Sequence, residues 1–392
     1  MLPRVIALLE IVSLIGTFSG TAYFVLCIWS ARRFLCGRIV ARESGSGSPS
    51  VLPPVSILKP LKGTDPEMYE SFRSHCLQDY PDYEIIFGVS DPADPTAELV
   101  ERLKLEFPQR AIRLLVSPNA LGSNVKVSNL AQMASIAKYD YFVVNDGDIR
   151  VPPDYLLQVI SPLLEPKVGL VTCLYRGVPG PTLGSRLESL GISTDFSAGV
   201  LAAQELEGGI RFGLGSTLAF RREVLKEVGG FESLLDFLAD DYELGVRISA
   251  TGRQVHLASI VVDTFLPAYS FRAFFEHQLR WARGVRDSRP WGYFGLLLTF
   301  GVTWALLLLL LARGAAWAWL ALLIVLFART TMAMAVGRQV LRDPNTTSLL
   351  WLLLLRDAVA VLVWAASYAG HTIHWRGDRF VLKNGRLTRI EP

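Results

Sequence analysis

The stretch YDYFVVNDGDIRV (residues 139–151) decides the fold of this chain and points to its chemistry. Five of the six residues from Tyr139 to Val144 are apolar or aromatic, and two aspartates, Asp146 and Asp148, follow one residue apart. An apolar run of this length, bounded by turn residues, is typical of a buried strand. The stretch therefore predicts a core strand that ends in two carboxylates.

Further strands and helices alternate along the chain before this stretch. The pattern predicts strands at residues 55–61, 83–91, 112–118 and 139–148, and helices at residues 67–78, 96–107 and 126–137. Alternating units of this kind form a doubly wound, Rossmann-like parallel sheet. We therefore expect an α/β domain.

Acidic residues follow two of these strands, because Asp91 ends the second strand and Asp146 and Asp148 end the fourth. Ligands of doubly wound sheets bind beyond the carboxyl ends of the strands. Two carboxylates there can hold Mg²⁺ or Mn²⁺, which usually bridges to a diphosphate. Asp and Gly are also common turn residues, so a plain turn stays open as an alternative. The sequence contains no GxGxxG or GxxxxGK[ST] motif, so it supports neither a dinucleotide site nor a P-loop.

Three later stretches extend the pattern. Residues 213–231 (GLGSTLAFRREVLKEVGGF) predict a glycine-rich turn, a strand and a helix. Asp240 and Asp241 stand at a predicted helix start, where they favour the helix dipole or act as a general base. Residues 271–284 (FRAFFEHQLRWARG) predict a helix of aromatic and arginine side chains at a membrane surface.

Both ends of the chain are strongly apolar. The chain is 51% hydrophobic with a mean hydropathy of +0.34, and the excess lies at the two ends. Residues 11–29 carry no charge and are long enough to span a bilayer. Arginines follow at once, whereas a cleaved signal peptide would carry basic residues before the apolar run. By the positive-inside rule, we expect an integral protein of the cytoplasmic membrane whose α/β domain is cytoplasmic.

Three more apolar runs cover residues 291–312, 315–336 and 349–370. Arg329 and Asp357 lie at similar depths in the last two runs, so we predict that they pair; separate snorkelling of each side chain is the alternative. Four spans would place the basic tail outside, but its charge favours the inside. If residues 349–357 lie at the interface, the number of spans changes, so the side of the tail stays open.

These features predict five segments: a membrane anchor (1–31), a basic juxtamembrane segment and linker (32–54), the α/β domain (55–289), C-terminal membrane helices (290–370) and a basic tail (371–392). The net charge of +3, from 39 basic and 36 acidic residues, is too small to indicate a nucleic-acid partner. The four cysteines form no CxxC pair and indicate neither a disulfide framework nor a zinc site. The oligomeric state is not fixed by the sequence.

Taken together, the motifs resemble a known family. Asp91 in VSDPADP, Asp146 in NDGDIRV, Asp241 in LADDYE and the HQLRW stretch (277–281) are similar to the D, D, D, (Q/R)xxRW signature of membrane-bound, family 2-like glycosyltransferases. Residues 56–66 (SILKPLKGTDP) and the WRGDRF tail motif resemble ceramide glucosyltransferases. VGLVTCLYRG (168–177) resembles the bacterial hopanoid-associated branch. The resemblance covers nearly the whole chain.

The resemblance implies a GT-A fold and an inverting transfer of glucose or N-acetylglucosamine. The donor would be a UDP-sugar, and the acceptor a hydroxyl of a membrane lipid, either ceramide or bacteriohopanetetrol. Asp91 would contact the uracil or ribose, and Lys59 would belong to the same donor site. Asp146 and Asp148 would hold Mn²⁺ or Mg²⁺ and the diphosphate.

The resemblance also assigns the reacting groups. Asp241 would deprotonate the acceptor, with Asp240 as the open alternative. Arg280 would neutralise the departing diphosphate and Trp281 would close the sugar pocket. His277 occupies the first position of the (Q/R)xxRW motif, so its contact with the sugar pocket departs from the family pattern.

Two further departures concern the metal and the acceptor. Asp148 stands where the ceramide enzymes carry a glycine, which favours stronger metal binding in this chain. Asp195, in GISTDFSAGVLAA (191–203), stands where those enzymes carry a histidine. This stretch is expected to line the acceptor entrance, so a different acceptor follows and the hopanoid is favoured over ceramide.

Two other functions compete with the lipid glycosyltransferase. A processive polysaccharide synthase shares the signature, but it needs a channel made of more spans than this chain offers. A non-catalytic, membrane-anchored nucleotide-sugar-binding protein would not need all three aspartate motifs and Arg280.

Overall fold

The computed structural model describes residues 2–43, 52–375 and 378–390. The chain forms two compact units, which we name by their content. The sheet unit comprises Ala41–Gly180, Glu207–Pro267 and Thr372–Pro392, and the helical unit comprises Met1–Val40, Pro181–Leu206 and Ala268–His371. Each unit is therefore assembled from three separate segments of the chain.

The sheet unit contains an eight-stranded sheet of order β3-β2-β1-β4-β7-β6-β8-β5. The strands are β1 (Val55–Pro60), β2 (Tyr83–Val89), β3 (Ala111–Val116), β4 (Tyr141–Val144), β5 (Ile149–Arg150), β6 (Val168–Val178), β7 (Leu218–Arg221) and β8 (Gln254–Phe265). The strands β1 to β4 are parallel, as expected. Strand β7 runs antiparallel to both of its neighbours, so the sheet is mixed rather than wholly parallel.

Helices flank the strands in the predicted alternation. They are α2 (Met68–Cys76), α3 (Thr96–Glu106), α4 (Val125–Ile136), α5 (Tyr155–Ile160), α8 (Arg222–Glu227) and α9 (Asp240–Ala250), with short 3-10 turns η1 (Ser161–Leu164) and η3 (Phe231–Leu234). The predicted helices at 67–78, 96–107 and 126–137 are confirmed as α2, α3 and α4. The turn, strand and helix predicted for residues 213–231 are confirmed by β7 and α8.

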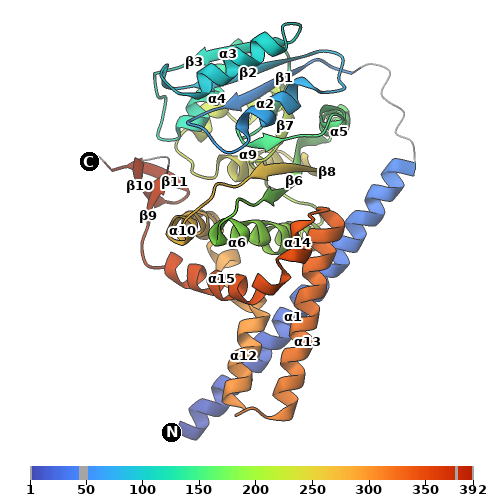
Figure 1. Cartoon of the computed structure of the whole chain (residues 1–392), viewed down its shortest axis with the longest axis vertical. Coiled ribbons are helices and arrows are strands. Elements are labelled where there is room, and N and C mark those ends of the chain that lie inside the picture. Colours follow the sequence, from blue (N-terminus) through green and yellow to red (C-terminus); the bar gives the residue numbers. More distant parts are fainter. Residues whose placement is uncertain (1, 44–51, 376–377, 391–392) are drawn as a thin grey trace. The chain divides into compact units, whose positions relative to one another are not determined.

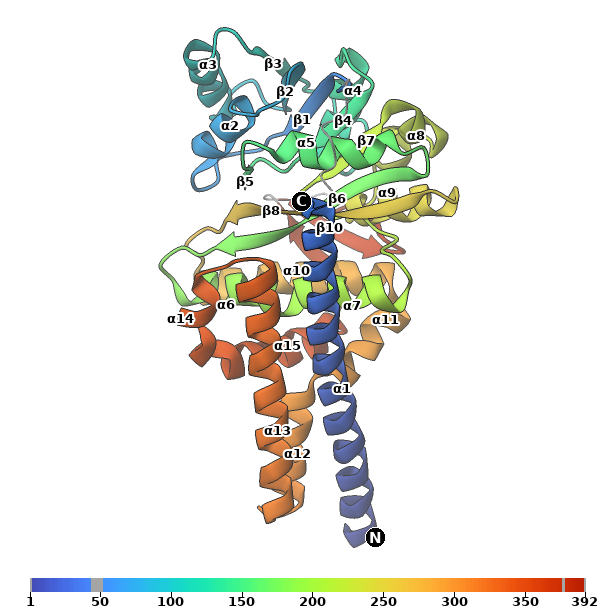
Figure 2. The same ribbon diagram turned by 90° about the vertical axis from the view of Figure 1, so that its right-hand side faces the viewer.

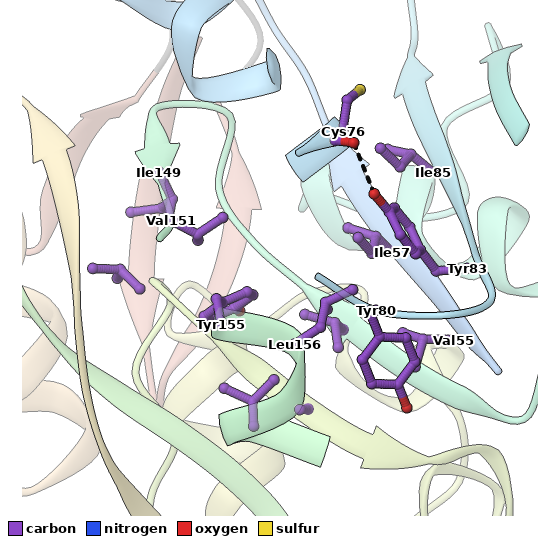
Figure 3. Packing of buried hydrophobic residues seen from close by; sticks show 14 of the residues in the cluster. Val55, Ile57, Cys76, Tyr80, Tyr83, Ile85, Ile149, Val151, Tyr155 and Leu156 are labelled. Atoms are coloured by element: carbon purple, nitrogen blue, oxygen red, sulfur yellow. Dashed lines mark hydrogen bonds between the residues drawn. The ribbon is translucent and has the colours of Figure 1, made fainter. Parts of the chain in front are cut away.

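One face of the sheet packs against α2, α3 and α5 to form the main core (Figure 3). Phe72 of α2 and Tyr155 of α5 have no exposed surface. The Tyr83 hydroxyl donates to the Cys76 carbonyl at 2.9 Å, which ties strand β2 to the end of α2. Burying an aromatic or aliphatic side chain contributes about 1.5–3 kcal/mol, so this layer holds the ends of β1, β2 and β4 in fixed positions.

The C-terminal residues form a second, three-stranded antiparallel sheet of β9 (Thr372–Trp375), β10 (Asp378–Lys383) and β11 (Arg386–Arg389). Gly385 adopts φ 76° at the turn between β10 and β11, a left-handed conformation that glycine adopts without strain.

The helical unit is built from helices throughout its described residues. They are α1 (Leu2–Glu43), α6 (Leu183–Gly191), α7 (Ser197–Leu206), α10 (Phe271–Ser288), α11 (Pro290–Gly295), α12 (Gly301–Leu311), α13 (Ala316–Ala333), α14 (Asn345–Ser348) and α15 (Leu353–Ser367), joined by π-helical segments η2 (Ile192–Phe196) and η5 (Met334–Val340) and by 3-10 segments η4 (Leu296–Thr299) and η6 (Leu350–Leu352). In Figures 1 and 2, α12 and α13 run alongside α1, whereas α15 runs across their direction.

Three helices among the described residues are long and apolar enough to cross a membrane: Arg4–Ile39, Ala316–Val340 and Leu350–Ser367. The pair Pro290–Thr299 and Gly301–Leu311 is bent by 52° and is a fourth candidate if it counts as one span. All four predicted apolar runs are therefore helical. The expected anchor at residues 11–29 is part of a much longer helix.

The contact between α1 and α12 depends on small residues. A Cβ atom at Gly20 would lie 2.2 Å from the Cα atom of Gly301, and one at Gly16 would lie 2.4 Å from the Trp304 ring. Gly16 and Gly20 form a GxxxG pair, which lets two helix backbones approach closely in a bilayer. A larger residue at Gly20 would separate the two helices.

Candidate active site

The NDGD turn after β4 is anchored by its first residue, Asn145, which has no exposed surface. Its amide nitrogen donates to the Tyr155 hydroxyl at 2.8 Å and to the Ser216 carbonyl at 2.7 Å. Its Oδ1 lies 3.2 Å from Nε2 of the buried His75. Asn145 thus joins β4, α5 and the segment before β7, so the two aspartates that flank Gly147 start from a rigid base.

Lys59 supports the same turn from the end of β1. Its side chain is fully buried, and its ammonium nitrogen donates to the Asp146 carbonyl at 3.0 Å. Burial lowers the pKa of Lys59 to about 7, although the charges of Asp148 and Asp146 act in the opposite direction. The structure therefore gives Lys59 a contact with the backbone that carries the aspartates.

Asp148 points toward β8. Its carboxylate accepts a short hydrogen bond from the Thr264 hydroxyl, and its carbonyl accepts from the Ser71 hydroxyl at 3.1 Å. Burial, together with the charge of Asp146, raises the pKa of Asp148 to about 6. A nearby cation would stabilise the ionised form of this carboxyl.

A lysine that the sequence analysis missed connects the two acidic motifs. Lys126 lies in the first turn of α4, and its ammonium nitrogen is 2.9 Å from Asp146 Oδ1 and 3.2 Å from Asp240 Oδ2. Burial lowers the pKa of Lys126, but the charges of Asp146, Asp240 and Asp241 outweigh this effect and raise it. Lys126 is therefore a permanent cation between the two motifs.

Asp146 and Asp241 meet at Gly215. A Cβ atom at Gly215 would lie 3.1 Å from Asp241 Oδ2 and 3.2 Å from Asp146 Oδ2. A side chain at this position would therefore press on both carboxylates. The glycine-rich turn at residues 213–216 is thus the place where the second and third aspartate motifs converge.

Asp240 and Asp241 differ in their surroundings at the start of α9. Asp240 is buried and pairs with Lys126, while Oδ1 of Asp241 accepts a hydrogen bond from its neighbour Tyr242 N at 2.8 Å. Burial, with the charge of Asp240, raises the pKa of Asp241 to about 6. Burial also raises the pKa of Asp240, against the effect of Lys126. Asp241 is thus a carboxylate poised to accept a proton near neutral pH.

The loop before α9 is held from two sides. On one side, the Asn124 amide donates to the Phe237 carbonyl at 2.7 Å. On the other side, the loop forms backbone hydrogen bonds with the C-terminal sheet. Leu238 N donates to the Gly385 carbonyl at 3.0 Å, and Leu387 N donates to the Asp236 carbonyl at 2.6 Å. The basic tail therefore contacts the segment that leads directly into Asp240.

Asp91 lies just beyond the end of β2 and is exposed. Its Oδ1 accepts a hydrogen bond from Ala93 N at 2.8 Å, which shapes the loop that leads to α3. The structure thus brings Asp146, Asp148, Asp240 and Asp241 together in one network with Lys59 and Lys126. Asp91 stands at the end of a different strand of the same parallel group.

His277, Arg280 and Trp281 lie on α10 in the helical unit. His277 Nδ1 is 3.0 Å from Glu188 Oε1 of α6, and its ring packs on Trp281 with centroids 4.9 Å apart. The His277 ring also stacks on Tyr269. The side chain at the first motif position is therefore fixed by neighbours within its own unit.

Asp195 belongs to a buried charge cluster of the helical unit. Its Oδ1 accepts a hydrogen bond from Arg329 Nη2 at 2.7 Å, and its Oδ2 lies 3.2 Å from Arg356 Nη2. The predicted pairing of Arg329 with Asp357 is confirmed, because Nη2 of Arg329 also donates to Asp357 Oδ1 at 2.7 Å. Asp195 is 31% exposed by side chain, whereas Arg329 is 3% exposed, so Asp195 is the accessible member of the cluster.

The carboxylates of the NDGD turn fit a divalent cation that takes further ligands from a substrate. No group of three or more His, Cys, Asp or Glu side chains with metal-ligand geometry occurs within the described ranges. Mg²⁺ and similar ions are often held by only one or two carboxylates together with substrate phosphates. Asp146 already binds the cationic Lys126 while its side chain stays 41% exposed, so it can accept a second positive group.

A signal for Lys126 was present in the sequence. A lysine in the first turn of a helix opposes the helix dipole, so its position there needs a compensating anion. The β8 strand was also missed, although it is 12 residues long. It carries Thr264, the partner of Asp148.

Comparisons with known proteins show the family of this chain. The family model described as glycosyl transferase family 21 matches residues 12–388. Ceramide glucosyltransferase 3 of Caenorhabditis elegans is 23% identical over 350 residues, covering 86% of this chain and 74% of that protein. Ceramide glucosyltransferase of Komagataella phaffii is 40% identical over 101 residues, or 25% of this chain and 20% of that protein.

A solved structure shares the fold. The mannosyltransferase PcManGT from Pyrobaculum calidifontis, in complex with GDP-Man and Mn²⁺, aligns with a TM-score of 0.55 and 21% identity. The alignment covers 92% of this chain and 99% of that structure. The expected GT-A-like α/β fold is thereby confirmed.

Proposed function

The chain belongs to glycosyl transferase family 21, and from this premise we propose that it transfers a sugar from a UDP-sugar to a hydroxyl group of a membrane lipid. The observation that carries the proposal is the meeting of Asp146 and Asp241 across Gly215, with Lys126 bound to Asp146. This arrangement sets a diphosphate-binding carboxylate beside a candidate base.

Asp241 is the base in this proposal, and it takes the proton of the acceptor hydroxyl as that oxygen attacks the sugar. Its raised pKa, about 6, suits a proton acceptor near neutral pH. Asp240 is paired with Lys126, so it orients the lysine and the start of α9 rather than the substrate. Lys59 positions the turn through the Asp146 carbonyl.

Asp146 and Asp148 would hold Mn²⁺ or Mg²⁺, which when bound neutralises charge on the diphosphate. Lys126 adds a fixed positive charge beside Asp146. Negative charge grows on the departing UDP as the sugar–phosphate bond breaks, and a cation already in place stabilises it without reorganisation. Asp91, exposed beyond β2, is the proposed contact of the uracil or ribose.

The roles of three residues on α10 rest on the HQLRW resemblance. Arg280 is proposed to neutralise the departing diphosphate and Trp281 to close the sugar pocket. His277 packs on Trp281, so we assign it the orientation of that ring.

The reaction proposed is a single displacement. One attack from the face opposite the leaving UDP inverts the anomeric carbon, so a UDP-α-sugar gives a β-linked product. An α-linked product, or a covalent sugar–enzyme intermediate, would refute this mechanism.

The acceptor in this proposal is a hopanoid polyol rather than ceramide. The argument rests on Asp195, which stands where the ceramide enzymes carry a histidine. The side chain of Asp195 is 31% exposed, so a hydroxyl group of the acceptor can approach it. The sugar is proposed as glucose or N-acetylglucosamine.

The cytoplasmic membrane is the proposed location, with the sheet unit on the cytoplasmic side. Arg32, Arg33 and Arg38 near the end of α1 support this orientation through the positive-inside rule.

The test is a transfer assay on purified protein in detergent. It crosses UDP-glucose and UDP-N-acetylglucosamine with bacteriohopanetetrol and ceramide, with and without Mn²⁺. Transfer to the hopanoid supports the whole proposal, and transfer to ceramide alone contradicts the Asp195 argument while keeping the lipid transferase. UDP binding without transfer to either lipid would favour a non-catalytic nucleotide-sugar-binding protein.

A further inference from the structure

The position of the C-terminal sheet constrains how often the chain crosses the membrane. Residues 372–392 fold together with residues 41–180 and 207–267 in the sheet unit. Backbone hydrogen bonds join Leu387 to Asp236 and Leu238 to Gly385, and Lys62 pairs with Asp378 at 3.6 Å. A folded unit lies on one side of a membrane. The chain must therefore cross an even number of times between Pro267 and Thr372.

Contacts along α1 give the directions of α12 and α13 relative to it. Gly20 and Gly16 contact Gly301 and Trp304 in turn, so α12 runs antiparallel to α1 toward the N-terminal end of α1. The chain then turns at residues 313–314, and α13 with η5 returns until Arg38 Nη1 donates to the Val340 carbonyl at 3.1 Å.

Arg38 lies near the end of α1 that leads into the sheet unit. Val340 is therefore on the side of the sheet unit, and the turn at 313–314 is on the opposite side. The bent pair Pro290–Thr299 and Gly301–Leu311, taken as one span, and the helix Ala316–Val340 supply two crossings between them. These two crossings already make an even number between Pro267 and Thr372, so α15 does not need to cross.

The surface of α15 fits a helix that lies in the membrane plane. Its exposed large side chains, together with Trp351 of η6, are all apolar and lie on one face: Trp351, Leu354, Leu355 and Leu362. The opposite face, which carries Arg356, Val363 and Ser367, is buried, and α15 contacts α10 and α6. An apolar face opposite a face with charged residues is typical of helices at the membrane surface.

The depth of α15 can be read from its ion pair. Asp357 binds Arg329, and the Arg329 guanidinium lies 5.8 Å from the Phe24 ring of α1. The apolar stretch of α1 ends at Trp29, five residues after Phe24. At a rise of 1.5 Å per residue, Phe24 is about 8 Å from that boundary, and the ion pair of Arg329 with Asp357 lies beside Phe24.

The lipid-facing belt of α13 ends at the same level. The large exposed apolar side chains of α13 run from Trp317 to Phe327, and Arg329 follows. The ion pair of Arg329 with Asp357 therefore places α15 at the end of the exposed apolar surface of α13.

We propose that α15 lies in the plane of the membrane surface, with the face of Trp351, Leu354, Leu355 and Leu362 on the lipid bilayer. The chain then crosses the membrane three times, through α1, the bent segment Pro290–Leu311 that ends in α12, and α13 with η5. The sheet unit, which includes the C-terminal sheet, and the segment at residues 341–349, which includes α14, share one side. The inference does not depend on the proposed transferase activity.

The first test maps the side of each loop with single cysteines. In a Cys36→Ser background, the full-length protein carries one added cysteine at an exposed position: Ser135→Cys, Ala316→Cys, Ser348→Cys or Thr388→Cys. A membrane-impermeant maleimide is applied to sealed vesicles of known orientation. We expect the cysteines at 135, 348 and 388 to react from one side, and the cysteine at 316 to react from the other. Reaction of 348 and 388 from opposite sides would show that α15 crosses, and would overturn the inference.

The second test measures the tilt of α15. Spin labels at Leu354→Cys and Leu362→Cys report depth by power saturation in vesicles. A helix in the membrane plane places the two labels at equal depth to within a few ångströms. A crossing helix separates them by about 12 Å, the rise of eight residues, and that result would overturn the inference even if labelling failed.

Discussion

The ammonium nitrogen of Lys126 lies 2.9 Å from Asp146 Oδ1, which joins the first turn of α4 to the turn that follows β4. The same nitrogen reaches Asp240 at the start of α9. One partly buried cation therefore connects the two acidic motifs, which are more than 90 residues apart along the chain. Its charge stabilises the ionised state of both carboxylates before any substrate binds.

Replacing Lys126 with methionine should lower transfer by about 100-fold, the effect of losing one preorganised group that stabilises developing charge. The loss of the cation also raises the pKa of Asp240 and Asp241, so the acid limb of the kcat/KM profile should move to higher pH. Lys126→Arg should recover part of the activity, and Lys104→Met on the exposed face of α3 is the control. An unchanged pH profile for Lys126→Met would contradict this role.

The activity should fall as the pH drops through about 6. The pKa of Asp241 is raised to about 6, and a base must be deprotonated to accept a proton. Activity is therefore full above this pH and lost below it. The Asp241→Asn variant should keep a low rate of transfer, and the pH dependence of that rate should no longer show a fall near pH 6. A profile that stays flat down to pH 5 would be inconsistent with this assignment.

The parts of this site that could be predicted from the sequence are those made by residues close together along the chain. Apolar runs bounded by turn residues predict β1 to β4 and place Asp91, Asp146 and Asp148 at the ends of strands. These signals are local, because each is read over a few neighbouring residues. The pairing of β7 between β4 and β6 and the reach of Lys126 to Asp240 depend on tertiary contacts. No pattern of neighbouring residues predicts that strand pairing or that contact.

In the apolar helices, one ion pair could be predicted from the sequence, but the other members of its cluster could not. Depth counting along two apolar runs predicted that Arg329 meets Asp357, and the contact is present at 2.7 Å. The participation of Asp195 and Arg356 was not predicted, because α6 and η2 read as part of the α/β domain. Apolar composition alone also cannot separate a crossing helix from one that lies on the membrane.

The Arg329–Asp357 pair should behave as a coupled unit. Asp357→Ala or Arg329→Ala alone leaves a buried charge with fewer partners, which costs about 3–5 kcal/mol when a buried pair is broken. The double alanine variant should be less destabilised than the sum of the two single variants. Thermal unfolding in detergent measures the cycle, with the exposed Arg338→Ala as the control. Additive losses would show that the two residues are not energetically coupled.

Removing the C-terminal sheet should weaken catalysis more than donor binding. Residues 372–392 hold Asp236, Phe237 and Leu238, which lead into Asp240. A protein ending at His371 should lose about 10-fold or more in kcat, a typical effect of misplacing a catalytic group, while its Kd for UDP changes little. Lys383→Ala, at an exposed position of β10, is the matched control. Equal losses in kcat and UDP affinity would indicate general unfolding instead.

In the proposed reaction, Asp241 activates a lipid hydroxyl beside a diphosphate held at Asp146. The most direct measurement compares lipid-dependent sugar transfer by the wild type and by Asp241→Asn, with UDP affinity measured on the same preparations. We expect transfer to fall by about 10²–10⁴-fold, the usual contribution of a general base, while UDP affinity stays within a few-fold. Transfer by Asp241→Asn at the wild-type rate would contradict the account.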